Sequence, residues 1–252
     1  MTTYDNRLIL DARDTEPVRQ ADGTGGMGAS GTTRGEQKVQ EITDEWYAIQ
    51  GNFVLFSTAA AGTGTASQAS VTAYDGAKDV LQVYNGQTPG ANGRSLLLRS
   101  IRMFVEVVPG GSGSQKYEFG LDSAGATARS AGSGTALTLR NVNPLATWLD
   151  KSSIVATVGA MTSVAQTGTR SLVYDGQIRF GVGLAADVFL FTFGDHLSLT
   201  SYLDPATTVG QQKHIPHGPL IIPPGYALRM QHYGASLSTA ATIQWRISGV
   251  LR

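Results

Sequence analysis

The sequence contains no cysteine, and this absence excludes several kinds of protein. Without that residue the chain can build neither a disulfide framework nor a thiolate metal site or nucleophile. Its 252 residues are enough to bury a full hydrophobic core, so packing and assembly must supply the stability. All-β sandwiches and barrels of this length commonly form one domain.

The chain also lacks an excess of either charge and a long apolar run. Lys plus Arg and Asp plus Glu number 19 each, so no overall field attracts nucleic acid. The first apolar run, residues 8–10, is far too short for a signal peptide or a membrane span. We expect a protein that binds neither nucleic acid nor membrane and stays in a cytoplasm-like compartment.

The first 45 residues differ from the remainder in charge and composition. They carry nine acidic and five basic residues, which leaves a net charge of minus four there and plus four beyond. From residue 11 to residue 35 there is almost no apolar periodicity, and residues 23–35 are rich in glycine. Such a segment cannot bury enough surface to offset its ordering entropy. We therefore divide the chain into an extended polar arm, residues 1–45, and a single β domain, residues 46–252.

Three apolar residues lie near the junction of arm and domain. Val39, Ile42 and Trp46 recur at spacings of three and four, the spacing of a short amphipathic helix or anchoring turn. We predict that these three side chains contact a partner.

Beyond Trp46 the apolar period changes to two. Ile101, Met103 and Val105 alternate with more polar residues, which indicates a strand with one buried face. The same reasoning predicts strands at residues 53–57, 70–74, 80–84, 100–107, 135–142, 154–158, 171–174, 178–182, 188–193, 197–202, 226–231 and 243–248.

Turn signals separate these strands. Asp175-Gly176, between two apolar runs, is the clearest prediction of a tight hairpin. Further signals are Asp75-Gly76, Asn85-Gly86, Asn92-Gly93, Pro109-Gly110-Gly111 and Pro223-Pro224-Gly225. One helix of about two turns is predicted to start at Asn143-Pro144. The pattern therefore predicts an all-β sandwich with at most one or two short helices.

The sequence contains no convincing motif for binding a nucleotide cofactor. Gly23, Gly25 and Gly28 have the spacing of a dinucleotide fingerprint, but no strand leads into them and Gly31 and Gly35 weaken the helix that should follow. None of the five lysines follows a glycine, so no phosphate-binding loop exists. We expect no cofactor.

The histidines point to ordinary structural roles. His214 and His217 could face one metal, but no third ligand lies within several residues, so we expect no metal site. Asp195 beside His196 resembles part of a catalytic triad, yet the elbow motif that exposes a serine is missing. We predict a non-enzymatic protein with no catalytic residues.

A glycan-directed role stays open from sequence. A glycosidase needs two opposed carboxylates, and nothing singles out such a pair among the ten acidic residues of the domain. Sugar-stacking aromatics are also possible, and the candidates are Tyr84, Tyr117, Tyr202 and Tyr233.

The closing region carries a resemblance. Residues 218–230 read Gly-Pro-Leu-Ile-Ile-Pro-Pro-Gly-Tyr-Ala-Leu-Arg-Met, and residues 241–249 read Ala-Thr-Ile-Gln-Trp-Arg-Ile-Ser-Gly. With the glycine-rich arm and the low-charge β domain, this pattern of strand, Pro-Pro-Gly turn and strand resembles structural proteins of tailed bacteriophages. These are capsid decoration (cement) and minor head proteins with jelly-roll-like sandwiches. The resemblance carries over no functional residue.

The resemblance implies a homotrimer that binds the major capsid protein or other virion subunits and strengthens the shell, in a virion assembled in the host cytoplasm. A genome-enclosing shell protein is disfavoured, since the arm is acidic and long helices are missing. The alternative is a tail-associated or receptor-binding sandwich that recognises a host glycan through loops such as residues 110–115 and 124–134. An enzyme acting on glycans comes last.

Overall fold

The fold comes from a computed structural model. It describes residues 28–31, 37–40, 47–48, 51–58, 64–66, 73–75, 78–90, 93–107, 113–124, 134–140, 153–159, 161, 170–180, 187–194, 212–234 and 241–252. The chain divides into two compact units, Met1–Gln50 and Gly51–Arg252.

In the first unit, β1 (Gly28–Gly31) pairs antiparallel with β2 (Gln37–Gln40). Val39 therefore lies in a strand, opposite Ala29, and the predicted helical turn does not include it. Helical spacing alone could not show this, because strand pairing depends on a partner that lies ten residues away. Tyr47 and Ala48 are helical.

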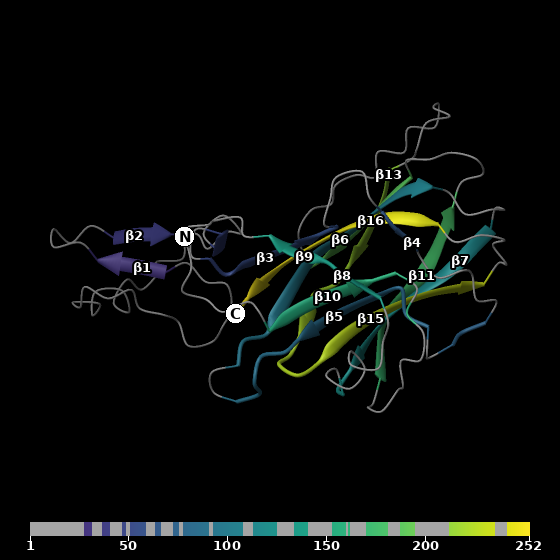
Figure 1. Cartoon of the computed structure of the whole chain (residues 1–252). Helices are drawn as coiled ribbons and strands as arrows, with labels where there is room; N and C mark the ends of the chain where they lie inside the picture. Colours follow the sequence, from purple (N-terminus) through teal and green to yellow (C-terminus); the bar gives the residue numbers. More distant parts are fainter. Residues whose placement is uncertain are drawn as a thin grey trace, which may run out of the picture. The chain divides into compact units, whose positions relative to one another are not determined.

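The second unit is a sandwich of two sheets (Figure 1). The eight-stranded sheet has the order β13-β12-β6-β16-β3-β9, with β14 paired to β6 and β4 paired to β16. Its strands are β3 (Phe53–Ser57), β4 (Thr65–Ala66), β6 (Leu96–Val107), β9 (Thr138–Arg140), β12 (Val188–Phe193), β13 (Gln212–His217), β14 (Leu220–Ile222) and β16 (Thr242–Leu251).

The six-stranded sheet has the order β11-β7-β15-β5-β10-β8. Its strands are β5 (Leu81–Asn85), β7 (Gly113–Asp122), β8 (Thr135–Ala136), β10 (Ile154–Val158), β11 (Arg170–Phe180) and β15 (Ala227–Gly234). In Figure 1, β5, β10 and β15 lie in one layer, and β3, β6 and β16 lie in the other.

The strand order is that of a jelly roll. Four antiparallel strands, β3-β16-β6-β12, form the centre of one sheet, and β5-β15-β7-β11 form the corresponding part of the other. The chain crosses repeatedly between the sheets, since β5, β11 and β15 are each followed along the chain by a strand of the opposite sheet, β6, β12 and β16 respectively. The predicted all-β, jelly-roll-like sandwich is therefore confirmed.

Alternation along the strands explains the core. On β6 and β16 the inward side chains are apolar and fully buried, while the residues between them face outward. The largest buried apolar side chains come from both sheets: Trp245, Phe119, Phe189, Phe191, Phe193, Leu81, Leu96, Leu98, Ile101 and Met103. Burial of these residues from both faces holds the layers together.

The predicted hairpin at Asp175-Gly176 is wrong. Both residues lie inside β11, where Asp175 is opposite Glu118 and Gly176 is opposite Tyr117. Glycine is needed here for space, because a Cβ on Gly176 would lie 2.4 Å from the Tyr117 hydroxyl. A local turn signal was overridden by packing between strands.

The Pro223-Pro224-Gly225 turn is present, and it connects β14 in one sheet to β15 in the other. Gly225 has a φ of 82°, a conformation that glycine adopts without steric cost. Strands at residues 53–57, 154–158 and 188–193 have the predicted bounds, whereas β7 and β13 were not predicted. The predicted strand at residues 197–202 and the predicted helix after Asn143 lie outside the described residues.

Candidate functional site

The predicted partner contact near the arm has one member in the described part of the chain. Val39 lies in β2, and Ile42 and Trp46 lie outside the described residues. The contact of these three residues with a partner stays a prediction.

The two neighbouring histidines do not share a site. They lie three residues apart on β13, so their side chains leave opposite faces of the strand. His214 Nε2 lies 2.8 Å from the Thr192 hydroxyl, whereas the His217 ring stacks on Tyr174 with 4.7 Å between centroids. Asp195 and His196 lie outside the described residues.

Within the described ranges, no three His, Asp or Glu side chains gather as a set of metal ligands. Among the same residues there is no helix with the length and apolar character of a membrane span. Two of the proposed sugar-binding features also change, because Tyr117 is buried and residues 113–115 belong to β7 and not to a loop.

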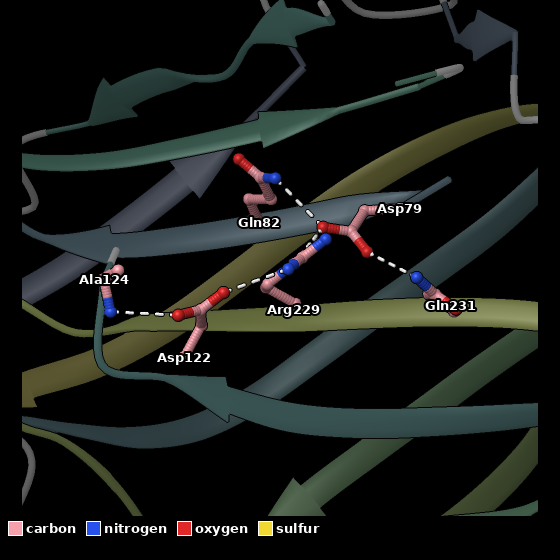
Figure 2. A network of polar contacts seen from close by, with 6 residues as sticks. All are labelled: Asp79, Gln82, Asp122, Ala124, Arg229 and Gln231. Atoms are coloured by element: carbon pink, nitrogen blue, oxygen red, sulfur yellow. Dashed lines mark hydrogen bonds and ion pairs between the residues drawn. The ribbon is translucent and has the colours of Figure 1, made fainter. Parts of the chain in front are cut away.

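A buried ionic network crosses the six-stranded sheet (Figure 2). Arg229 on β15 donates to Asp79, just before β5, at 2.5 Å and to Asp122 on β7 at 3.0 Å. All three side chains are fully buried. The amides of Gln82 and Gln231 donate to Asp79 at 2.9 Å, and the backbone N–H of residue 124 donates to Asp122 at the same distance.

This network satisfies its charges internally. Burial alone would lower the pKa of Arg229, but its bonds to Asp79 and Asp122 outweigh that effect and raise the pKa. The guanidinium therefore stays charged, and the surplus negative charge is shared with three N–H donors. We interpret the network as a device that holds β5, β7 and β15 in register.

A second cluster joins the two sheets around His217. The Tyr117 hydroxyl lies 3.2 Å from His217 Nε2, and the Tyr174 hydroxyl donates to the carbonyl of Pro219 at 2.9 Å. Burial lowers the pKa of His217, against the opposing effect of Asp175. Burial, assisted by Asp175, raises the pKa of Tyr117 to about 12. Both rings are therefore neutral at pH 7 and act as packing groups with fixed polar contacts.

The outer face of the eight-stranded sheet carries a row of arginines. Arg102 on β6 is directly opposite Arg246 on β16, and Arg246 is opposite Ser57 on β3. Arg140 on β9 extends over β3, where its Nε donates to the Ser57 hydroxyl at 3.0 Å. Three guanidinium side chains thus lie across four adjacent strands at one level of the sheet.

These arginines line an open groove with a volume of about 480 Å³. We call it the arginine groove, and its lining residues are Leu55, Ser57, Thr58, Arg102, Phe104, Arg140, Gln244, Trp245 and Arg246. Arg102, Arg140 and Arg246 are exposed, and Phe104 and Leu55 are half-buried. The arrangement offers positive charge, hydroxyl and amide groups, and an apolar surface in one place, which suits recognition of an anion with polar substituents.

This groove was not predicted from the sequence. The three arginines are 38 and 106 residues apart along the chain, with Arg102 first and Arg246 last. Arg102 and Arg246 occupy outward positions of strands with alternating burial, which was a usable signal. Only the strand order shows that β9, β3, β16 and β6 are neighbours.

A scan against protein-family models, a search of curated proteins and a search of solved structures each found no match to the chain. We therefore infer function from the fold and from the geometry of the groove.

Proposed function

We propose that this protein is a non-enzymatic structural component of a virus particle, and specifically a capsid decoration or cement protein of a tailed bacteriophage. The observation that carries the proposal is the jelly-roll order of the strands, β3-β16-β6-β12 facing β5-β15-β7-β11. Capsid proteins are among the main users of this fold, together with lectins and cupins. In this proposal the partners are the major capsid protein or other virion subunits, and the chain forms a homotrimer.

Two further features support a structural role. Three of the chain's buried charged side chains, Arg229, Asp79 and Asp122, are bonded to one another in a way that orders strands. The low proportion of charged residues, 15%, and the many glycines suit a protein that presents flat β surfaces to neighbours. Fold alone supports a class of function, and the particle must be tested directly.

A second candidate function is recognition of a host glycan by a tail-associated or receptor-binding sandwich. The arginine groove favours it, because an open hollow with polar and apolar lining lies on the outer face of a sheet. Lectins show that jelly rolls can present such sites.

The test of the proposed function is immunogold labelling of particles from the source system, with antibody raised against this chain. We expect label distributed over the head. Label confined to the tail would favour the second candidate, and particles without label would reject both. Antibody pre-absorbed with the purified protein is the control for nonspecific labelling.

A further inference from the structure

The arginine groove contains a charge arrangement that is unfavourable in an empty groove. Arg102 and Arg246 are a directly opposed pair on adjacent strands, and like charges at such positions repel. Arg140 brings a third positive charge to the same level through its bonds to Ser57 and to the carbonyl of Thr58. An anion placed between the guanidinium groups would convert this repulsion into attraction.

The described protein groups do not neutralise the charges of Arg102 and Arg246. Within the described ranges, neither Arg102 nor Arg246 forms an ion pair with a carboxylate. Glu106, two positions beyond Phe104 on the same face of β6, accepts instead from the Gln244 amide and from the backbone N–H of Gly64. The charges of Arg102 and Arg246 are therefore available to an anion from outside the protein.

The remaining lining indicates what carries the negative charge. Gln244 and the hydroxyls of Ser57 and Thr58 offer polar groups beside the guanidinium groups, and Phe104 with Leu55 offers an apolar surface. A sugar has the same combination of hydroxyls and apolar ring faces, and arginine binds a carboxylate through two parallel hydrogen bonds. The volume of about 480 Å³ lies within the range of small-ligand sites.

An acidic peptide is disfavoured by the position of the groove. Extended peptides usually gain affinity by pairing with an exposed strand edge. Here β6, β16 and β3 each have strand neighbours on both sides, so the groove opens on the face of the sheet where their main-chain groups are already paired.

We propose that the arginine groove is a binding site for a carboxylated saccharide, with Arg102 and Arg246 holding the carboxylate. Phe104 and Leu55 support the ring, and Gln244 contacts its hydroxyls. This inference goes beyond a decoration role and names the ligand class of the second candidate function. It concerns the isolated protein, so it can fail while labelling of the head succeeds, and the reverse also holds.

The test is isothermal titration calorimetry of the full chain with two carboxylated probes, trigalacturonic acid and an α2,8-linked oligosialic acid. The fully methyl-esterified trigalacturonate is the matched neutral ligand. We expect at least one acidic probe to bind. The ester should bind more weakly than the acid by a factor of roughly ten or more, because charge-assisted hydrogen bonds are lost. Added salt should lower the affinity for the acidic probe and leave the affinity for the ester unchanged.

Protein variants locate the site. Arg246→Gln and Arg102→Gln should each lower the affinity for the acidic probe by a factor of roughly ten or more. Lys116→Gln is the matched control, since Lys116 is an exposed cation on β7 of the other sheet. The Lys116→Gln variant should bind the acidic probe with the same affinity as the unmodified protein.

Several results would overturn the proposal. Failure of both acidic probes to bind, equal affinity for the ester, or unchanged affinity in Arg246→Gln would each do so. Tighter binding of a polyglutamate peptide or a single-stranded DNA oligonucleotide than of either saccharide would assign the groove to another class of polyanion.

Discussion

At the scale of single residues, Arg229 and His232 lie on opposite faces of β15, and burial affects their charge states differently. Arg229 keeps its charge because Asp79 and Asp122 are bonded to it. His232 is buried on the core side, opposite Tyr117, and burial lowers its pKa to about 4. The same strand therefore contains a buried arginine that is charged because it is ion-paired, and a buried histidine that is neutral because it is desolvated.

The buried network predicts a large loss of stability when its cation is removed. Arg229→Met would leave Asp79 and Asp122 fully buried without a positive partner. We expect the free energy of unfolding to fall by about 3–5 kcal/mol, measured by urea denaturation followed through tryptophan fluorescence. Arg246→Met, at an exposed position, should change it by no more than about 0.5 kcal/mol. Equal losses in the two variants would show that the network does not carry this energy.

His232 predicts a specific dependence of stability on pH. Its pKa is about 4 in the folded protein and about 6.5 in an unfolded chain. Between these values the unfolded state binds a proton that the folded state does not, so stability falls as the pH is lowered from about 6.5 to 4. At pH 4, His232 lowers the free energy of unfolding by about 3 kcal/mol, and above pH 6.5 this loss is absent.

The measurement is the free energy of unfolding at intervals from pH 7.5 to 4 for the unmodified protein and for His232→Gln. The variant should lose clearly less stability over this window, although its stability at pH 7.5 is lower. Parallel curves over the whole window would mean that other groups cause the acid sensitivity.

At the scale of elements, β11 is a continuous strand along β7, with one irregularity between Leu172 and Tyr174. At Gly176 of this strand, the ring and hydroxyl of Tyr117 occupy the place of a side chain. The same Tyr117 hydroxyl reaches His217 on β13 of the other sheet, so this point couples the two layers.

Gly176→Ala should therefore displace Tyr117 and destabilise the sandwich by about 1–3 kcal/mol, measured as a shift in the urea midpoint. Gln177→Ala is the control at the next position of β11, where the side chain is exposed. If Gly176→Ala behaves like Gln177→Ala, the close contact with Tyr117 is relieved at no cost.

At the scale of the whole molecule, the chain has an acidic first segment and a body that is a jelly roll. The body, from Gly51 onward, contains both sheets of the sandwich and the hydrophobic core cluster. The first 45 residues carry a net charge of minus four, and the remainder carries plus four. This division allows assembly and folding to be tested separately.

Deletion of residues 1–45 should leave the β body folded and abolish its incorporation into particles. Folding is measured by circular dichroism and urea denaturation, and incorporation by the amount of the chain in purified particles beside the full-length protein. Undiminished incorporation of the shortened chain would reject a role for the arm in assembly. Loss of folding would instead place the arm within the cooperative unit.

Some of this structure could be read from the sequence, because side-chain alternation is a local property. Strands β6, β12 and β16 follow from the alternation of residues such as Ile101, Met103 and Trp245, and together with the turn signals they were enough to predict an all-β sandwich. The alternation of Lys116, Tyr117, Glu118 and Phe119 would also have revealed β7.

By itself, then, the sequence determined the fold class, most strand positions and the absence of cysteine chemistry. Tertiary structure alone decided which strands are neighbours, and with that the placement of Asp175-Gly176 inside β11, the pairing of Arg229 with Asp79 and Asp122, and the gathering of three distant arginines in one groove. The physical reason is that alternation depends on adjacent residues, whereas burial of charge and opposition across a sheet depend on partners that are distant along the chain.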